Sequence, residues 1–376
     1  MARTAIVGGT IWCGDGNVIR DGVLVFDGER IEAVGQGPVP KGAQEVSARG
    51  RYVLPGLVEA HAHLGVHVLG GGWEGNDSNE STDPVTPQVR AIDALYPLDP
   101  AMDSARAAGV TTALVTPGSG NVVSGQSVVL HLAGRAADAM VLRLPAGIKA
   151  ALGENPKGVY RTQHKMPSTR MGAVALLRQA LSDAQSYAEK DGRRDLKLEA
   201  LSRVTRREIP LRIHCHRADD ILTALRIRRE FNIDITLEHV TEGYLVAEEI
   251  AEAGVPAMVG PALSGRYKVE LRNKHARNPV VLHEAGVKVS LITDHPIQQI
   301  ETLPWSAALA VREGMPEQAA LRAITLTPAE GLGVADRVGS LAPGKMADAV
   351  IWRGHPFAIQ SRVRRTYIAG EVVYEA

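Results

Sequence analysis

The sequence is poor in cysteine, in net charge and in long apolar runs, and each shortage excludes a class of protein. Its 376 residues include two cysteines, Cys13 and Cys215, which give no disulfide framework and suit a reducing compartment. The 42 basic residues balance 42 acidic ones, so no bulk field attracts nucleic acid or an anionic membrane. No run of about eighteen apolar residues is present, so no segment is expected to span a membrane.

The sequence as a whole has the composition of a globular protein, because 45% of its residues are hydrophobic and 22% are charged. The N-terminal stretch MARTAIVGGTIWCGDGNVI reaches glycine and aspartate too early for a secretory signal. We therefore expect a soluble, cytoplasmic protein whose partner is a small-molecule substrate, with no nucleic acid and no membrane. The sequence leaves open whether the chain forms a homo-oligomer.

The two ends of the chain carry the pattern of short β-strands. Near the N-terminus, TAIVGGTIW and GVLVFDGERIEAVGQ alternate apolar runs with turn residues, and the Asp-Gly pair is typical of hairpins. GSLAPGKMADAVIW and RRTYIAGEVVYEA near the C-terminus show the same pattern. Neither end has enough strands for a stable sheet alone. We therefore expect residues 1–54 and 334–376 to combine into one small β-sandwich domain.

Between these ends, residues 55–333 alternate strand-like apolar runs with helix-like stretches such as GAVALLRQALSDAQSYAEK. Eight strands alternating with helices predict an α/β protein built on a closed parallel (β/α)8 TIM barrel. The third strand candidate could instead be an inserted hairpin, and the Gly-rich stretch 70–88 predicts a long loop near the barrel mouth. The strand candidates are LVEAHAH, VTTALVTPG, QSVVLHL, AGIKAALGE, LRIHCH, DITLEHV, PAMVGP and VKVSLITDH.

Histidines and carboxylates recur where these strand candidates end. In a parallel barrel all such ends open on one face, where the active sites of barrel enzymes lie. Alternation along the first strand puts both histidines of His-Ala-His on one side, so both can point inward. Imidazoles and carboxylates clustered at one mouth are what a divalent ion such as zinc requires. The residues in question are His61, His63, Glu154, His214, His216, His239 and Asp294.

The motifs around these residues resemble those of the amidohydrolase superfamily, the metal-dependent TIM-barrel hydrolases, in the branch related to imidazolonepropionase. LPGLVEAHAHLG resembles the ligand motif of the family's first strand, and LEHVTEG and SLITDHP resemble the motifs of its sixth and eighth strands. The tail LAPGKMADAVIW resembles the segment with which these chains return to their β-domain. The resemblance covers essentially the whole chain.

The resemblance implies a set of metal ligands. His61 and His63 would hold a first ion, with Asp294 as a shared ligand and proton shuttle. His214 and His239 would hold a second ion or complete a mononuclear site. Zinc is the expected metal, as one or two ions, with manganese or iron as alternatives.

A bridge between two ions is also implied, because many members of this superfamily use a carbamylated lysine on the fourth strand. Here Glu154 ends the fourth strand candidate, so the sequence favours a glutamate bridge. A carbamate on Lys149, five residues earlier, is the alternative. The number of ions depends on this choice.

The implied reaction is the cleavage of a non-standard C–N bond in an amide, a cyclic amide or a dipeptide-like substrate. A bound cation lowers the pKa of water toward about 7. Asp294 would accept the proton and pass it to the leaving nitrogen, while a second ion or His239 polarises the carbonyl. A ring-amidine deaminase would use nearly the same ligands. A catalytically decayed scaffold protein typically lacks a first-strand histidine or the eighth-strand aspartate, and this chain keeps both.

Further polar residues near the strand ends are candidates for substrate contact. An arginine fork suits a substrate carboxylate, although a surface ion pair is an equally good interpretation. Of the two fifth-strand histidines we expect one to bind metal and the other to support the site or face the substrate. His214 is preferred as the ligand, because it follows the apolar run directly, and the sequence leaves this choice open. Cys215 between them points the other way by strand alternation and is expected to be buried. The substrate-binding candidates are Asn121, Tyr160, Arg170, His216 and His295.

Overall fold

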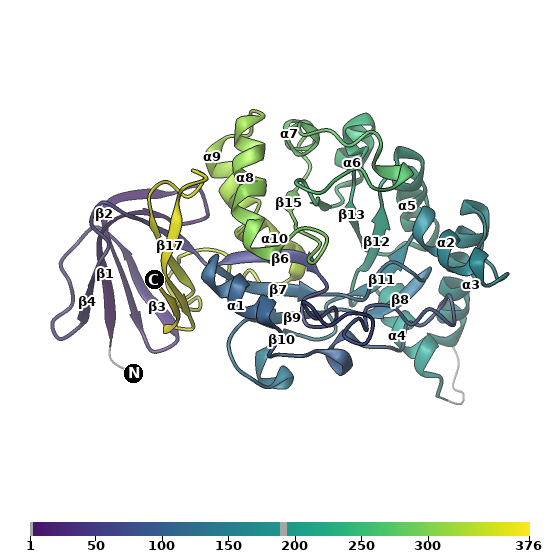
Figure 1. Cartoon of the computed structure of the whole chain (residues 1–376), viewed down its shortest axis with the longest axis horizontal. Coiled ribbons are helices and arrows are strands. Elements are labelled where there is room, and N and C mark those ends of the chain that lie inside the picture. The colour runs from purple at the N-terminus through teal and green to yellow at the C-terminus, as the bar shows by residue number, and fades with distance from the viewer. Residues whose placement is uncertain (1–2, 189–193) are drawn as a thin grey trace.

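An eight-stranded sheet built from both ends of the chain lies at one side of the molecule (Figure 1). The computed structural model describes residues 3–188 and 194–376. The strand order is β18-β17-β16-β5-β1-β2-β3, and β4 pairs with β1. The two ends meet where β16 runs antiparallel to β5, with Val350 opposite Leu54. The strands are β1 Thr4–Trp12, β2 Val18–Asp27, β3 Arg30–Gly35, β4 Gln44–Ser47, β5 Tyr52–Pro55, β16 Ala349–Arg353, β17 Arg362–Ile368 and β18 Glu371–Glu375.

Two further sheets form the centre of a TIM-barrel-type fold with mixed α and β structure. One has the order β10-β9-β7-β6 and the other the order β15-β14-β13-β12-β11-β8. Neighbouring strands from β11 to β15 are all parallel, as are β6 and β7. Their bounds are β6 Leu57–Ala62, β7 Val110–Val115, β8 Val123–Gln126, β9 Val128–His131, β10 Val141–Arg143, β11 Ile148–Ala151, β12 Leu211–Cys215, β13 Ile235–His239, β14 Ala257–Val259 and β15 Val289–Leu291.

The third strand candidate departs from the expected parallel barrel. QSVVLHL covers the end of β8 and all of β9, which are separated by Ser127, and both strands run antiparallel to their neighbours β11 and β7. Only residues 116–122 connect β7 to β8. A parallel return needs a crossover of about a dozen residues or more, so this short connection sends the chain back antiparallel.

Backbone hydrogen bonds bring β6 beside the chain that follows β15. The backbone nitrogen of Asp294 donates to the backbone oxygen of His61 at 3.1 Å. The backbone nitrogen of His63 donates to the backbone oxygen of His295 at 2.8 Å. The first and last strand candidates are therefore neighbours, although β6 and β15 belong to different sheets. Their carboxyl ends open on the same face.

Helices connect successive strands from β11 to β15, which is the expected α/β alternation (Figure 1). In α5, Ile221, Leu225 and Phe231 are buried on the face toward the sheet. No helix in the described part of the chain is long and apolar enough to cross a membrane. The helices are α1 Pro100–Ala107, α2 Glu154–Thr162, α3 Arg170–Ala188, α4 Leu196–Thr205, α5 Ala218–Phe231, α6 Ala247–Ala253, α7 Asn278–Glu284, α8 Leu303–Arg312, α9 Glu317–Arg322 and α10 Leu326–Leu332.

A buried histidine–aspartate hydrogen bond ties the central strands to the sheet of the chain ends. Nε2 of His131, the last residue of β9, lies 2.8 Å from Oδ2 of Asp348, and both residues are buried. Oδ1 of Asp348 also accepts from the backbone nitrogen of Ala369 at 2.9 Å. Asp348 thus joins three segments that are far apart in the sequence.

We expect Asp348→Ala to lower the free energy of unfolding by about 3 kcal/mol, because it leaves His131 and a backbone N–H buried without their acceptor. Urea denaturation of the metal-free protein measures the change. Asp336→Ala, at an exposed position, is the matched control and should leave the stability nearly unchanged. Equal stability of the two variants would contradict this role.

Candidate metal centre

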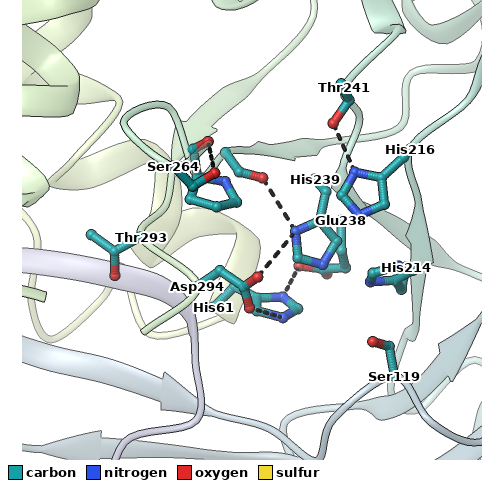
Figure 2. Close-up of polar contacts among 12 residues, drawn as sticks. His61, Ser119, His214, His216, Glu238, His239, Thr241, Ser264, Thr293 and Asp294 are labelled. Atoms are coloured by element: carbon teal, nitrogen blue, oxygen red, sulfur yellow. Dashed lines mark hydrogen bonds and ion pairs between the residues drawn. The ribbon is translucent and has the colours of Figure 1, made fainter. Parts of the chain in front are cut away.

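The carboxyl ends of β6 and β15 bring two histidines and an aspartate together. Figure 2 shows His61 and Asp294 of these three. Nε2 of His61 lies 3.6 Å from Oδ1 of Asp294, and Nε2 of His63 lies 3.3 Å from the same oxygen. Nδ1 of His63 bonds to the backbone oxygen of Thr116 at 2.8 Å, which directs Nε2 toward Asp294. These residues stand where the sequence predicted the ligands of a first ion.

Three more histidines gather at the ends of β12 and β13. The rings of His214 and His239 lie 4.4 Å apart between centroids, and the ring of His216 lies 4.6 Å from His214. All three residues are buried. His239 has a φ of 73° and Asp294 a φ of 55°, a left-handed backbone that is uncommon for non-glycine residues and is enriched at active sites.

The polar atoms of this cluster fit a divalent cation. Both ring nitrogens of His214, Nε2 of His239 and Oε1 of Glu270 are buried without a hydrogen-bond partner among the described residues. Each such atom costs about 1–3 kcal/mol unless a partner is supplied. Two groups, one of His214, His216 and His239 and the other of His61, His239 and Asp294, each have ligand atoms within 4.8 Å of one another. Imidazole and carboxylate donors of this kind suit zinc.

Lys149, on β11, reaches the middle of the cluster. Its Nζ lies 2.9 Å from Nε2 of His61, whose Nδ1 donates to Oε2 of Glu238 at 2.7 Å. Burial lowers the pKa of Lys149 to about 8, so a fraction of its amine is uncharged near neutral pH. Burial and the Lys149 ammonium lower the pKa of His61 to about 4, which keeps its ring neutral and able to bind a cation.

Two carboxylates of the site are held in the ionised form. Burial by itself would raise the pKa of Asp294, but His239 and the two histidines of His-Ala-His lower it below its usual range. Burial likewise opposes ionisation of Glu238, but the hydrogen bond from His61 and the charge of Arg212 bring its pKa to about 2. Asp294 is therefore a proton acceptor at neutral pH.

Glu154 does not reach the ligand cluster, and its position argues against the expected glutamate bridge. The strand β11 ends at Ala151, and Glu154 is the first residue of α2. Its Oε2 accepts from the backbone nitrogen of Glu270 at 3.1 Å. Lys149, the alternative weighed from the sequence, is the residue of this segment that contacts His61.

Asn121 and Tyr160 bond to each other, so their placement argues against the expected substrate contact. The hydroxyl of Tyr160 donates to Oδ1 of Asn121 at 2.7 Å. Nδ2 of Asn121 donates to the backbone oxygen of Glu80 and to the hydroxyl of Thr86, each at 2.8 Å. The amide thus ties the loop of residues 70–88 to α2.

Arg170 and His295 are also engaged within the protein. Nε of Arg170, at the start of α3, lies 3.0 Å from Oδ1 of Asp220 in α5, so the ion-pair interpretation of Arg170 holds. His295 is fully buried, and its Nδ1 accepts from the backbone nitrogen of Ile300 at 3.3 Å. Its backbone oxygen accepts a hydrogen bond from the backbone nitrogen of His63, so His295 helps to position a first-strand histidine.

A cavity of about 270 Å³ opens on the cluster and is lined by His63, His214 and Asp294. This volume suits a small molecule. Asn76 and Asn79 belong to the long loop that the sequence places near the mouth. Most of the remaining wall is neutral and polar, and Lys268 is the charged exception; this wall includes His67, Asn76, Ser78, Asn79, Ser119, Asn155, Tyr267 and Lys268.

Sequence reasoning missed Glu238 and Glu270. Glu238 directly precedes His239 in LEHV, and a glutamate inside a strand with apolar residues on either side is a signal that could have been noticed. Glu270 lies in a short 3-10 helix, Val269–Leu271, within an irregular segment after β14. No local pattern distinguishes it from the many surface carboxylates of the chain.

Comparisons with known proteins agree with this geometry. The model of the Amidohydrolase family matches residues 52–373. The imidazolonepropionase of Cupriavidus taiwanensis is 26% identical to this chain over 366 residues, which cover 89% of this chain and 85% of that protein. The crystal structure of an amidohydrolase from Thermotoga maritima MSB8 has a TM-score of 0.96 and 38% identity, and the match covers 99% of this chain and 100% of that one.

A longer relative is also similar. The amidohydrolase tasK of Hapsidospora irregularis is 29% identical over 402 residues, covering 98% of this chain. The match spans 41% of that protein, so the chain corresponds to less than half of this relative.

The buried histidines predict a pH-dependent stability for the metal-free protein. Burial lowers the pKa of His214, His216 and His239 well below 6.5. The unfolded chain then binds more protons than the folded chain below about pH 6.5, so stability falls as the pH falls. We expect a slope of up to about 1.4 kcal/mol per pH unit for each histidine, measured by urea denaturation in EDTA. His214→Gln should flatten this slope, and a stability that does not change between about pH 7 and 5 would contradict the assignment.

Proposed function

Because the chain belongs to the amidohydrolase family, in the branch related to imidazolonepropionase, we propose that it is a metal-dependent hydrolase of a non-standard C–N bond. Its substrate would be a small amide, cyclic amide or dipeptide-like molecule. The observation that carries this proposal is the set of buried imidazole and carboxylate atoms that have no hydrogen-bond partner among the described residues and lie beside the cavity lined by Asp294.

We assign the metal ligands to two groups. His61, His63 and Asp294 would hold one ion, and His214 and His239 a second, with zinc as the preferred metal. When bound, the cation supplies Lewis-acid activation of water and of a carbonyl group. The neutral ring of His61 and the ionised carboxylate of Asp294 are the protonation states that ligation needs.

Lys149 replaces Glu154 as the proposed bridge between the two ions. The amine of Lys149 would add to carbon dioxide, forming an N–C bond and releasing one proton, to give an anionic carbamate. Support comes from its position 2.9 Å from Nε2 of His61 and from burial, which favours the uncharged amine. Glu154 has no comparable contact with a histidine of the cluster among the described residues.

Asp294 is the proposed proton shuttle. Its carboxylate lines the cavity and stays ionised, so it can accept a proton from water and deliver it to the leaving nitrogen. The backbone bond from Asp294 to His61 fixes the distance between this carboxylate and the first-strand histidines. Nδ1 of His239 lies 3.8 Å from Oδ2 of Asp294, and His239 is assigned as a metal ligand.

We also propose that residues 55–333 form the catalytic domain, while residues 1–54 and 334–376 form a composite β-sandwich domain. The shared sheet of the two chain ends supports this division. The histidines and carboxylates assigned above all lie in the central segment.

We expect Asp294→Asn to lower turnover by about 10²–10⁴-fold, because the amide cannot accept the proton. The amide oxygen should still permit metal binding, so the metal content serves as the internal control. The assay screens zinc-loaded protein against N-acyl amino acids, dipeptides, imidazolones and cyclic imides. Asp138→Asn, at an exposed position, is the matched control and should keep the activity. Full turnover of Asp294→Asn would refute the shuttle.

We expect Lys149→Met to reduce the number of bound ions, while Glu154→Gln leaves it at the wild-type value. Elemental analysis after zinc reconstitution in bicarbonate measures both variants. Added short-chain carboxylates should restore binding to Lys149→Met, because they can replace the lost carbamate. If Glu154→Gln loses an ion and Lys149→Met does not, the bridge has been assigned to the wrong residue.

A further inference from the structure

One carboxylate points into the histidine cluster from a segment that the proposed ligand set does not include. Glu270 lies in the short helix Val269–Leu271 after β14 and is 1% exposed. Its Oε1 lies 3.6 Å from Nε2 of His214 and 3.6 Å from Nε2 of His216. The same oxygen is buried and has no hydrogen-bond partner among the described residues.

The 3.6 Å separations between these atoms match a shared cation better than direct bonding. A nitrogen and an oxygen that form a hydrogen bond lie about 2.7–3.2 Å apart. Two ligand atoms bound tetrahedrally to one zinc ion, at bond lengths of about 2.0–2.2 Å, lie roughly 3.3–3.6 Å from each other. Asp294 stands at similar distances from His61 and His63, the residues assigned to the other ion.

Neighbouring groups hold these atoms in place. Oε2 of Glu270 accepts from the backbone nitrogen of Glu154, and Oε2 of Glu154 accepts from that of Glu270, each at 3.1 Å. Nδ1 of His216 bonds to the hydroxyl of Thr241 at 2.7 Å (Figure 2). This bond directs Nε2 toward Glu270. Hydrogen bonds that fix the orientation of a ligand in this way are usual around metal sites.

The competing interpretation is an ordinary ion pair, because Nζ of Lys268 lies 2.8 Å from Oε1 of Glu270. That contact gives Oε1 a cationic neighbour, although it is not among the hydrogen bonds of the described residues. It also leaves both ring nitrogens of His214 unsatisfied. A cation between His214, His216 and Glu270 would satisfy the oxygen and one nitrogen of each ring.

We propose that Glu270 and His216 are additional ligands of the divalent ion on the His214 side. This inference rests on the proposed metal centre and assigns one aspartate or glutamate to each ion, Asp294 to the first and Glu270 to the second. It also changes the role of His216 from substrate contact to ligation.

The test measures metal binding rather than turnover. The full chain is stripped of metal, and zinc is titrated against a chromophoric chelator for wild type, Glu270→Gln and His216→Asn. We expect each variant to bind one ion at least about 100-fold more weakly, a larger loss than removal of a supporting hydrogen bond produces. The other ion should bind as in wild type. His216→Asn provides the test if Glu270→Gln does not fold.

Lys268→Met and Glu154→Gln are the matched controls, because each removes a charge beside Glu270 while keeping the Glu270 carboxylate. In Glu154→Gln the amide oxygen can still accept from the backbone nitrogen of Glu270. Wild-type metal affinity in both controls, with a loss in Glu270→Gln, supports the proposal. Wild-type affinity in Glu270→Gln, or an equal loss in Lys268→Met, overturns it while leaving the metal centre intact. A wild-type chain that binds no zinc overturns the metal centre and this inference together.

Discussion

Burying several imidazoles and carboxylates against one another without hydrogen-bond partners costs free energy. The other contacts of the site must hold these groups in place despite that cost. His214 is the extreme case, because both of its ring nitrogens are buried without a partner among the described residues. Such atoms remain inside only where packed strands hold them and a ligand compensates for the lost water. A divalent cation can bind several of these atoms at once and so offset the cost of burying them.

The rigidity of the site comes from buried polar contacts within the strands. Nε of Arg212 in β12 donates to the backbone oxygen of Ala146 at 3.1 Å, and its Nη1 lies 3.5 Å from Oε1 of Glu238. Glu238 in turn accepts from His61. Three strands therefore fix the ring of His61 before any metal binds. A ligand held in this way loses little side-chain entropy on binding, which favours affinity.

Segments outside the strands supply Glu154, Glu270 and part of the cavity wall. The reciprocal bonds between Glu154 and Glu270 join the start of α2 to the segment after β14, so neither carboxylate moves independently of the other. The long loop of residues 70–88 is anchored by Asn121 and contributes Asn76 and Asn79 to the wall. Polar residues from these loops therefore form much of the cavity wall.

The sequence alone determined the family, the alternation of strands and helices, and the strand-end positions of His61, His239 and Asp294, because strand periodicity and motif spacing are local properties. The direction of the third strand needed the length of its connection to be considered together with both neighbouring strands. The sequence favoured Glu154 over Lys149 because the end of the strand could not be located within three residues, and that error changes which side chain reaches the cluster. Glu270 lies more than fifty residues from His214 in the chain, and only tertiary packing brings its carboxylate within 3.6 Å of that ring.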